Sequence, residues 1–366
     1  MEHTKERNFV IHLLKLFLGR TDKLYTELED LDWSAVLQIA RFNKIRPSIY
    51  HVLAKYYTEF TNTEVVRLKM EVLGITAFNL QQLTELSALI KLLKDNNIEI
   101  IPYKGLVLSK AAFNGFGMRE FSDIDFLFQK KDFHQVKRLL LEKGYQTEKK
   151  IPRTFEKVYL YHHCEYNFLF KEHNQRKFFV EPHWFLGTRM LQNNISFKQV
   201  KQLTATGTLS SADATNLLGP EGLLLTTCIH HTSIRYPTFK SIMDVATLLA
   251  RYADEIDWKK ILAVSKEWGI QNILLFSIHL ASTELEAPLP EKVKVLVGEK
   301  LSSQLLSNYK KHVLDTGVKP FTVKYHYKRI RLQFLLRDSL YTKSKILWFT
   351  FLYYATFKVF FRNKEI

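Results

Sequence analysis

The sequence predicts an α+β protein in which a small mixed β-sheet core is flanked by N- and C-terminal helical regions. Apolar residues recur at helical spacing up to about residue 95 and again from about residue 190, whereas short apolar runs separated by turns fill the stretch between them. With 46% hydrophobic residues and only 13 glycines and 9 prolines among 366 residues, the chain can bury a large core and is not of a disordered class. We therefore expect four segments: helical residues 1–95, an α+β core at 96–190, a helical domain at 191–305, and a basic, aromatic-rich helical tail at 306–366.

Start signals support the two helical regions. Asp32 precedes Trp33 and the apolar pattern that follows, so we expect it to cap that helix. Pro47 interrupts the same pattern and is expected to begin a new helix, because proline fits the first turn of a helix and not its interior. The second region holds four stretches with helical spacing, at 219–234, 239–256, 258–285 and 290–309.

The core is expected to alternate strands and helices. Residues 98–103 (IEIIPY) and 122–129 (SDIDFLFQ) are short apolar runs typical of buried strands, and a short helix at 106–113 separates them. The next helix ends at Gly144. Three further strands are expected at 145–149, 161–171 and 177–186, with a turn at 173–176 between the last two.

Positive charge is concentrated in the tail. The chain has a formal net charge of +16, and Leu306–Ile366 holds 13 Lys or Arg against 3 Asp or Glu. This excess indicates either an anionic partner (nucleic acid, a phosphorylated ligand or a membrane surface) or a solvated face without a dedicated partner. Ile346–Phe357 carries no charge but is too short to span a bilayer, which needs about 20 apolar residues. We expect a buried docking helix there, with an interfacial membrane helix as the alternative.

The compartment is expected to be the cytoplasm. The N-terminal residues lack the small-residue cleavage site of a signal peptide, and Cys164 and Cys228 lack the spacing of a metal site or a disulfide framework. Membrane association through the tail stays open beside this expectation.

Two acidic residues mark the strongest candidate site. Asp123 and Asp125 are two apart on a predicted strand, so their side chains project from the same face, with Ile124 and Phe126 on the buried face. Adjacent carboxylates repel, and a divalent cation relieves that repulsion; oxygen ligands of this kind suit Mg²⁺ or Mn²⁺. An Asp-x-Asp pair alone is a common chance pattern, and its alternative is a solvated pair at a strand end.

Glu181 is the candidate third metal ligand. It lies in the apolar run FFVEPHWF, where a charged residue needs a partner and a shared metal would supply one. Three carboxylates around metal ions would suit nucleotidyl transfer, in which an acceptor oxygen displaces pyrophosphate at the α-phosphorus of a nucleoside triphosphate (NTP).

These residues belong to a longer pattern. The segment IPYKGLVLSKAAFNGFGMREFSDIDFLF resembles the uncharacterised nucleotidyltransferase family of the polymerase-β-like superfamily, with matching positions at Lys104, Gly105, Arg119, Asp123 and Asp125. VEPHW, with Glu181 and His183, resembles the acidic-x-His-Trp element of that family. A helical element with His230, His231, Lys240 and Asp244 resembles the helical element of that family. The opening helices also resemble those of the family, so that the resemblance covers nearly the whole chain. It implies a Mg²⁺- or Mn²⁺-dependent site in which Asp123, Asp125 and Glu181 bind metal.

The phosphate side of the site departs from the wider superfamily. Lys104-Gly105 stands where Gly-Ser or Gly-Gly is usual; Gly105 still permits close approach of a triphosphate at a helix N-terminus, and Lys104 adds a charge. Arg119 is expected either to bind phosphate or to pair with Glu120 or a metal-site carboxylate.

His183 has two interpretations, and Asp244 has one expected set of partners. His183 shares the strand face of Glu181 and is either a proton carrier or group orienting a carboxylate, or a satisfied core histidine. Asp244 is a lone acid in an apolar helix and is expected to pair with His230, His231 or Lys240.

Two classes of function remain open. The first is a nucleotidyltransferase that uses an NTP and an acceptor hydroxyl on a small molecule or protein, with nucleic acid ranked below these because the aromatics of the tail do not alternate with basic residues. The second is a catalytically inactive binding or regulatory protein of the same fold, antitoxin-like or acting at a membrane surface. The sequence contains no dinucleotide-binding GxGxxG after a strand, no P-loop, no HExxH zinc helix and no GxSxG nucleophile motif.

Overall fold

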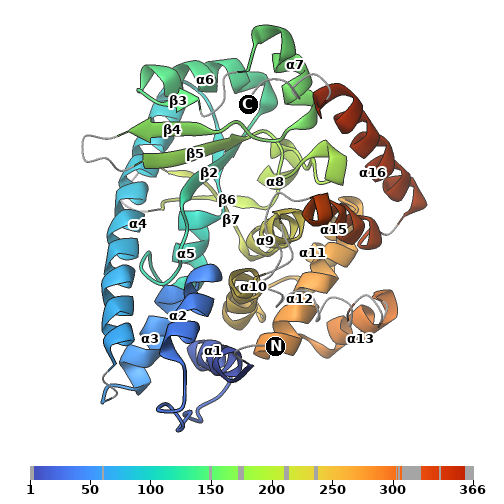
Figure 1. The fold of residues 1–366 in the computed structure, drawn as a ribbon. Coiled ribbons are helices and arrows are strands. Elements are labelled where there is room, and N and C mark those ends of the chain that lie inside the picture. Colours follow the sequence, from blue (N-terminus) through green and yellow to red (C-terminus); the bar gives the residue numbers. More distant parts are fainter. Residues whose placement is uncertain are drawn as a thin grey trace.

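The computed structural model shows the α+β architecture expected from the sequence: a five-stranded sheet and a two-stranded sheet surrounded by helices (Figure 1). It describes residues 4–59, 62–147, 151–171, 177–209, 214–234, 238–301, 303, 306, 323–337 and 339–358. The expected turn at 173–176 lies outside these residues, as does much of the tail. The division into four domains stays a prediction.

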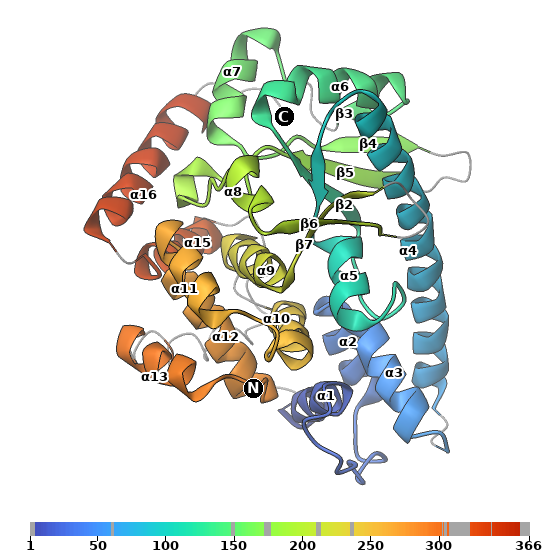
Figure 2. The same ribbon diagram turned by 180° about the vertical axis from the view of Figure 1, so that it is seen from behind.

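Four helices form the N-terminal region: α1 (Thr4–Phe17), α2 (Trp33–Phe42), α3 (Arg46–Tyr56) and α4 (Thr63–Asp95). The start signals are confirmed, because the side chain of Asp32 accepts a hydrogen bond from the backbone N–H of Ala35 and Pro47 lies in the first turn of α3. The 33-residue helix α4 runs along one side of the molecule past the five-stranded sheet, where the Phe78 ring stacks on Phe178 of a strand at 5.6 Å (Figures 1 and 2).

The five-stranded sheet has the order β1-β2-β5-β4-β3. Its strands are β1 (Ile100–Pro102), β2 (Asp123–Phe128), β3 (Gln146–Thr147), β4 (Phe168–Lys171) and β5 (Lys177–His183). β2 and β5 are parallel, and the other pairs are antiparallel. Helix α5 (Gly105–Phe113) connects β1 to β2, and η1 (Lys130–Asp132) with α6 (Phe133–Glu142) follows β2. The parallel β2–β5 pair is the part of this sheet that carries the acidic residues.

Two expectations about the strands were wrong. The strand expected at 161–171 begins only at Phe168, because helix α7 (Arg153–His162) extends into the expected range. Tyr159 and His162 are buried on one side of α7, three residues apart, which is a helical and not a strand spacing. The stretch after residue 190 is also not wholly helical. After η2 (Arg189–Leu191) and α8 (Phe197–Lys201), strands β6 (Thr204–Gly207) and β7 (Thr215–Leu218) form an antiparallel pair beside β1, where the Thr215 hydroxyl donates to the carbonyl of Ile100.

The C-terminal helices are α9 (Pro220–Ile234), α10 (Phe239–Tyr252), α11 (Trp258–Glu267), α12 (Gln271–Leu285), α13 (Glu291–Lys300), α15 (Val323–Leu335) and α16 (Leu340–Leu352), followed by a π-helical turn (Tyr353–Lys358). Helices α9, α10 and α12 pack on one another, and α10 also contacts α5 (Figure 2). This contact brings the C-terminal helices next to α5, which connects β1 to the acidic strand β2.

The apolar segment near the C-terminus is only partly buried. Ile346 of α16 is fully buried, but Leu347, Trp348 and Phe351 are exposed, so the expectation of a buried docking helix was wrong for the outer face. Within the described residues, no helix is both long and apolar enough to cross a bilayer.

Candidate active site

Asp125 and Glu181 lie side by side on the parallel strands β2 and β5. They are direct partners in the strand register, and both side chains are on the sheet face opposite the fully buried residues Ile124 and Phe126. His183 is two residues beyond Glu181 and therefore on the same face. One ligand atom from each of Asp125, Glu181 and His183 lies within 4.8 Å of the others. The strand pairing thus brings Asp125 together with a carboxylate and an imidazole that lie more than fifty residues further along the chain.

Lys104 reaches this cluster from the end of β1. Its Nζ donates a hydrogen bond of 2.7 Å to Oδ1 of Asp125 and lies 3.4 Å from Nε2 of His183. The residue has φ 58° and ψ −139°, a conformation that is almost confined to glycine. Such strain costs on the order of 1–3 kcal/mol and is held only where the surroundings enforce it. The lysine thus adopts a glycine-like backbone at the position where the superfamily pattern has glycine, and directs its ammonium group to Asp125.

These contacts set the charges of the cluster. Burial acts to raise the pKa of Asp125, but Lys104 and His183 outweigh it and lower the pKa to about 2. For Lys104 and His183, burial alone would lower each pKa. The surrounding acidic groups and Tyr103 outweigh burial and raise both pKa values well above their ordinary values. Asp125 is therefore ionised at neutral pH.

The remaining carboxylates are not neutralised to the same extent. Burial, with the neighbouring charges of Glu165 and Asp125, raises the pKa of Glu181 to about 7. Burial and the charge of Asp125 also raise the pKa of Asp123. Bare carboxylates are thus disfavoured beside Asp125, and a bound cation would restore their ionised forms. The carboxylate oxygens of Asp125 and Glu181 fit a hard divalent ion such as Mg²⁺ or Mn²⁺.

Asp123 is placed differently from the other two acids. It is the first residue of β2 and pairs in register with Phe179. Among the described residues, it belongs to no group of potential ligands that converge within 4.8 Å. The structure therefore brings Asp125 and Glu181 together and leaves Asp123 at the start of the same strand.

Gly105 brings the N-terminus of α5 against the start of β2. A Cβ atom at Gly105 would lie 3.2 Å from the backbone oxygen of Asp123 and 3.3 Å from Cδ2 of Phe121. Only glycine allows this approach without displacing a neighbour. The first turn of α5, where the backbone N–H groups of a helix favour anions, is thereby held next to Asp123.

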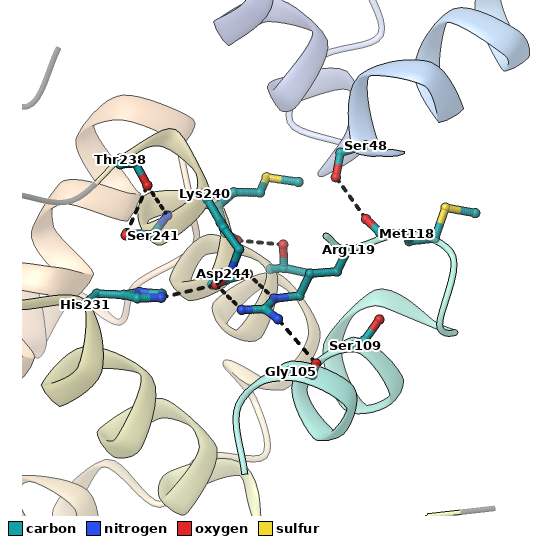
Figure 3. A network of polar contacts seen from close by, with 12 residues as sticks. Ser48, Gly105, Ser109, Met118, Arg119, His231, Thr238, Lys240, Ser241 and Asp244 are labelled. Atoms are coloured by element: carbon teal, nitrogen blue, oxygen red, sulfur yellow. Dashed lines mark hydrogen bonds and ion pairs between the residues drawn. The ribbon is translucent and has the colours of Figure 1, made fainter. Parts of the chain in front are cut away.

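Arg119 is buried, and its guanidinium is occupied by protein groups (Figure 3). It donates two hydrogen bonds to Asp244 of α10, at 2.7 and 2.8 Å, and one of 3.3 Å to the carbonyl oxygen of Gly105. Its expected pairing with Glu120 does not occur: Glu120 pairs with Arg46. Contact between Arg119 and phosphate stays a prediction, whereas its structural contacts tie α10 to the start of α5.

Asp244 pairs as expected, and with more partners than expected. Oδ2 lies 3.2 Å from Nζ of Lys240 and 3.2 Å from Nε2 of His231 (Figure 3). Burial would raise the pKa of Asp244, but Arg119 and Lys240 hold it well below the ordinary value. His230 does not appear among the described partners of Asp244.

Glu165 belongs to the site and was missed in the sequence. Its Oε2 lies 3.2 Å from Nδ1 of His183, the ring nitrogen that faces away from Asp125. In the structure, an isolated antiparallel β-bridge joins Glu165 to His183. The sequence contains no signal for this bridge, because residues 161–171 were expected to form one continuous strand. A carboxylate on the far nitrogen orients an imidazole and stabilises its protonated form.

A second group of potential ligands consists of Cys164, Glu165 and His183. Burial raises the pKa of the Cys164 thiol to about 11. Since a metal is bound by the thiolate and not by the thiol, this group is a weaker candidate for a metal than Asp125 and Glu181.

A mixed sheet that presents carboxylates beside a glycine-led helix N-terminus defines a protein of nucleotidyltransferase type. The model of the uncharacterised nucleotidyltransferase family matches residues 29–285, and the chain belongs to this family. The match includes every residue of the site described above. No curated protein sequence matches the chain.

Three solved structures are among those that match the chain, each with low sequence identity and a TM-score below 0.5. The crystal structure of ANT(2″)-Ia in complex with adenylyl-2″-tobramycin is 16% identical, with 60% of this chain and 96% of that chain covered and a TM-score of 0.29. A solution structure of ANT(2″)-Ia is 15% identical, with 64% and 98% covered and a TM-score of 0.30. A nucleotidyltransferase-like protein from Paracoccidioides brasiliensis is 12% identical, with 56% and 92% covered and a TM-score of 0.33.

Proposed function

We propose that this protein is a Mg²⁺-dependent nucleotidyltransferase that moves a nucleoside monophosphate from an NTP to an acceptor hydroxyl and releases pyrophosphate. The observation that carries the proposal is the convergence of Asp125, Glu181 and His183 on neighbouring parallel strands, beside the N-terminus of α5. In the reaction the bond between the acceptor oxygen and the α-phosphorus forms while the bond to the pyrophosphate oxygen breaks, and the hydroxyl proton leaves to a base.

Asp123, Asp125 and Glu181 are the residues that we assign to the metal. When bound, Mg²⁺ would neutralise the charge that develops on the phosphate oxygens and lower the pKa of the acceptor hydroxyl. Both described contacts of Asp125 use Oδ1, so we assign Oδ2 to the metal. His183, held by Glu165 on its other side, would fix the orientation of Asp125.

Lys104 and Gly105 are assigned to the triphosphate. The first turn of α5 would offer backbone N–H groups to phosphate oxygens, and Gly105 allows them to approach closely. The Lys104 ammonium lies within reach of the same region and would add a positive charge. For Arg119, its contacts favour a positioning role: it holds the carbonyl of Gly105 and so fixes the start of α5.

One observation favours the alternative of a nucleotide-binding protein that does not catalyse transfer. The Lys104 ammonium already neutralises Asp125 at 2.7 Å, as a cation built into the chain. If metal cannot share Asp125 with Lys104, the fold would bind nucleotide without activating it.

Incubation with NTPs labelled on the α-phosphate, with Mg²⁺ and a host lysate, tests the proposal. The variants are Asp125→Asn and Glu181→Gln, and Glu142→Gln on the exposed side of α6 is the matched control, because within the described part of the chain its carboxylate pairs with the exposed Arg138. We expect label to pass to an acceptor with the wild type and the control, and to fall by at least about a hundredfold with either site variant. Equal labelling by all four proteins would refute catalysis at this site. Nucleotide binding without any transfer would support the alternative.

A further inference from the structure

Helix α16 exposes an apolar, aromatic face. Five of its large side chains are between 57% (Trp348) and 84% (Leu340) exposed; the others are Tyr341, Leu347 and Phe351. At about 100° per residue, the five lie within an arc of about 120° on the helix surface. A helix of a globular protein normally turns such a face toward the core, and contiguous exposed apolar surface of this kind marks a site of interaction.

The opposite side of α16 is anchored. Ile346 is fully buried, and the ring of Phe349 lies 6.4 Å from the ring of Tyr161 and 5.9 Å from the guanidinium of Arg189. Both views place α16 at the outer edge of the molecule, away from the sheet and on the opposite side from α4 (Figures 1 and 2). The apolar face is therefore held in a fixed direction, outward from the protein.

Lysines border this face on both sides. Lys343 and Lys345 each lie about 40° outside the apolar arc, one on either edge. Nζ of Lys345 lies 4.1 Å from the ring centre of Tyr341, and Nζ of Lys343 lies 5.6 Å from that of Phe334. Long cationic side chains at the rim can cover apolar surface with their stems while their ammonium groups stay in a polar layer. The rest of the tail adds to this charge, since Leu306–Ile366 has 13 basic against 3 acidic residues.

We propose that the outer face of α16 binds the surface of a bilayer that contains anionic lipids. Trp and Tyr favour the boundary between headgroups and acyl chains, Leu and Phe favour the acyl side, and the bordering lysines favour anionic headgroups. An exposed stripe on α4 has a different character: Val66, Met70 and Leu73 are aliphatic or thioether side chains without aromatic rings. The composition of the α16 face is thus that of an interfacial helix, and its length keeps it in the plane of the surface.

Co-sedimentation of the full chain with lipid vesicles tests the proposal. One set is pure phosphatidylcholine, and in the other roughly a third of the lipid is phosphatidylglycerol. We expect binding to the anionic vesicles that weakens at high salt. Trp348→Ala with Phe351→Ala should lower the partition coefficient at least about tenfold. Lys343→Gln with Lys345→Gln should lower it about fivefold for each lysine on anionic vesicles and leave the weak binding to neutral vesicles unchanged.

Met70→Ala with Leu73→Ala on α4 is the matched control, because it removes comparably exposed apolar groups from another surface. This control should bind vesicles like the wild type. The changed apolar side chains are exposed and the two lysines are partly exposed, so circular dichroism should be the same for every variant. Wild-type binding by the Trp348/Phe351 variant, or no binding to anionic vesicles by the wild type, would overturn the proposal. The proposal would also be overturned if the wild type bound no vesicles but formed a dimer in light scattering, and if the Trp348/Phe351 variant converted this dimer to a monomer.

Discussion

The carboxylate of Asp244 offers the most direct test of how the helical region is joined to the site. In Asp244→Asn, the buried guanidinium of Arg119 and the ammonium of Lys240 lose the anion that both contact. We expect the free energy of unfolding to fall by about 3–5 kcal/mol, the usual cost of leaving a buried charge without its partner.

The structure supports a value in that range. Asp244 is 1% exposed and Arg119 is 6% exposed, so solvent screens their interaction little. Two unit charges about 4 Å apart interact by about 4 kcal/mol at the effective dielectric constant of a protein interior, and the paired hydrogen bonds of 2.7 and 2.8 Å fix the geometry. By contrast, the pair of Arg138 and Glu142 is exposed and should contribute no more than about 0.5 kcal/mol.

Urea unfolding followed by far-UV circular dichroism measures the change, with Glu142→Gln as the control. A double-mutant cycle with Asp244→Leu and Arg119→Met should show that the two losses do not add, because the second removes a charge that the first had left unpaired. The folded pKa of Asp244 is lowered. Its contribution is therefore complete above about pH 4, the ordinary range of an unfolded aspartate, and declines as the pH falls through the folded pKa. A loss no larger than that of Glu142→Gln, or simple additivity in the cycle, would refute this account.

Three further predictions concern the residues around the site. Gly105→Ala should lower the free energy of unfolding by about 1–3 kcal/mol and weaken NTP binding in a nucleotide titration, because its Cβ would press on the Asp123 carbonyl at 3.2 Å; unchanged binding would contradict it. Lys104→Gly should raise the affinity for Mg²⁺ without nucleotide by about tenfold in calorimetry, since the ammonium that competes for Asp125 is gone; an affinity equal to that of the wild type would exclude competition. For Lys240, burial and the charge of Arg119 lower the pKa to about 8. The free energy of unfolding of the wild type, relative to that of Lys240→Met, should therefore increase as the pH rises from about 8 to about 10.5. A difference in unfolding free energy that stays constant over this interval would count against a buried ammonium.

The acidic strand could be found in the sequence because its signals are local. Asp123, Ile124 and Asp125 alternate on a short apolar run, and alternation fixes which side chains share a face. Glu181 could be found for a related reason, since a charge in an apolar strand requires a partner. That Asp125 and Glu181 would be direct register partners could not be foreseen, because register depends on how distant strands align.

Other features depend on tertiary contacts that leave no local pattern. The positive φ of Lys104 has no sequence signal, since lysine does not favour it, and it is held by the ion pair with Asp125. Arg119 stood in the right loop for phosphate, but α10 packs against α5 and gives it Asp244 as a partner. The exposed side of α16 could not be foreseen either, because an uncharged run does not reveal which of its faces meets the core.

The two proposals rest on separate parts of the chain. The range that matches the family ends at residue 285, after α12. It contains every residue of the candidate site, whereas α16 begins at Leu340. Arg119 links the site to α10 within the matched range, through Asp244 on one side and the Gly105 carbonyl on the other. Helix α10 is therefore part of the machinery that positions α5. A membrane-binding face on α16 would determine where the protein is located and not how it binds nucleotide. Trp348→Ala with Phe351→Ala should therefore weaken vesicle binding and leave NTP binding in solution unchanged.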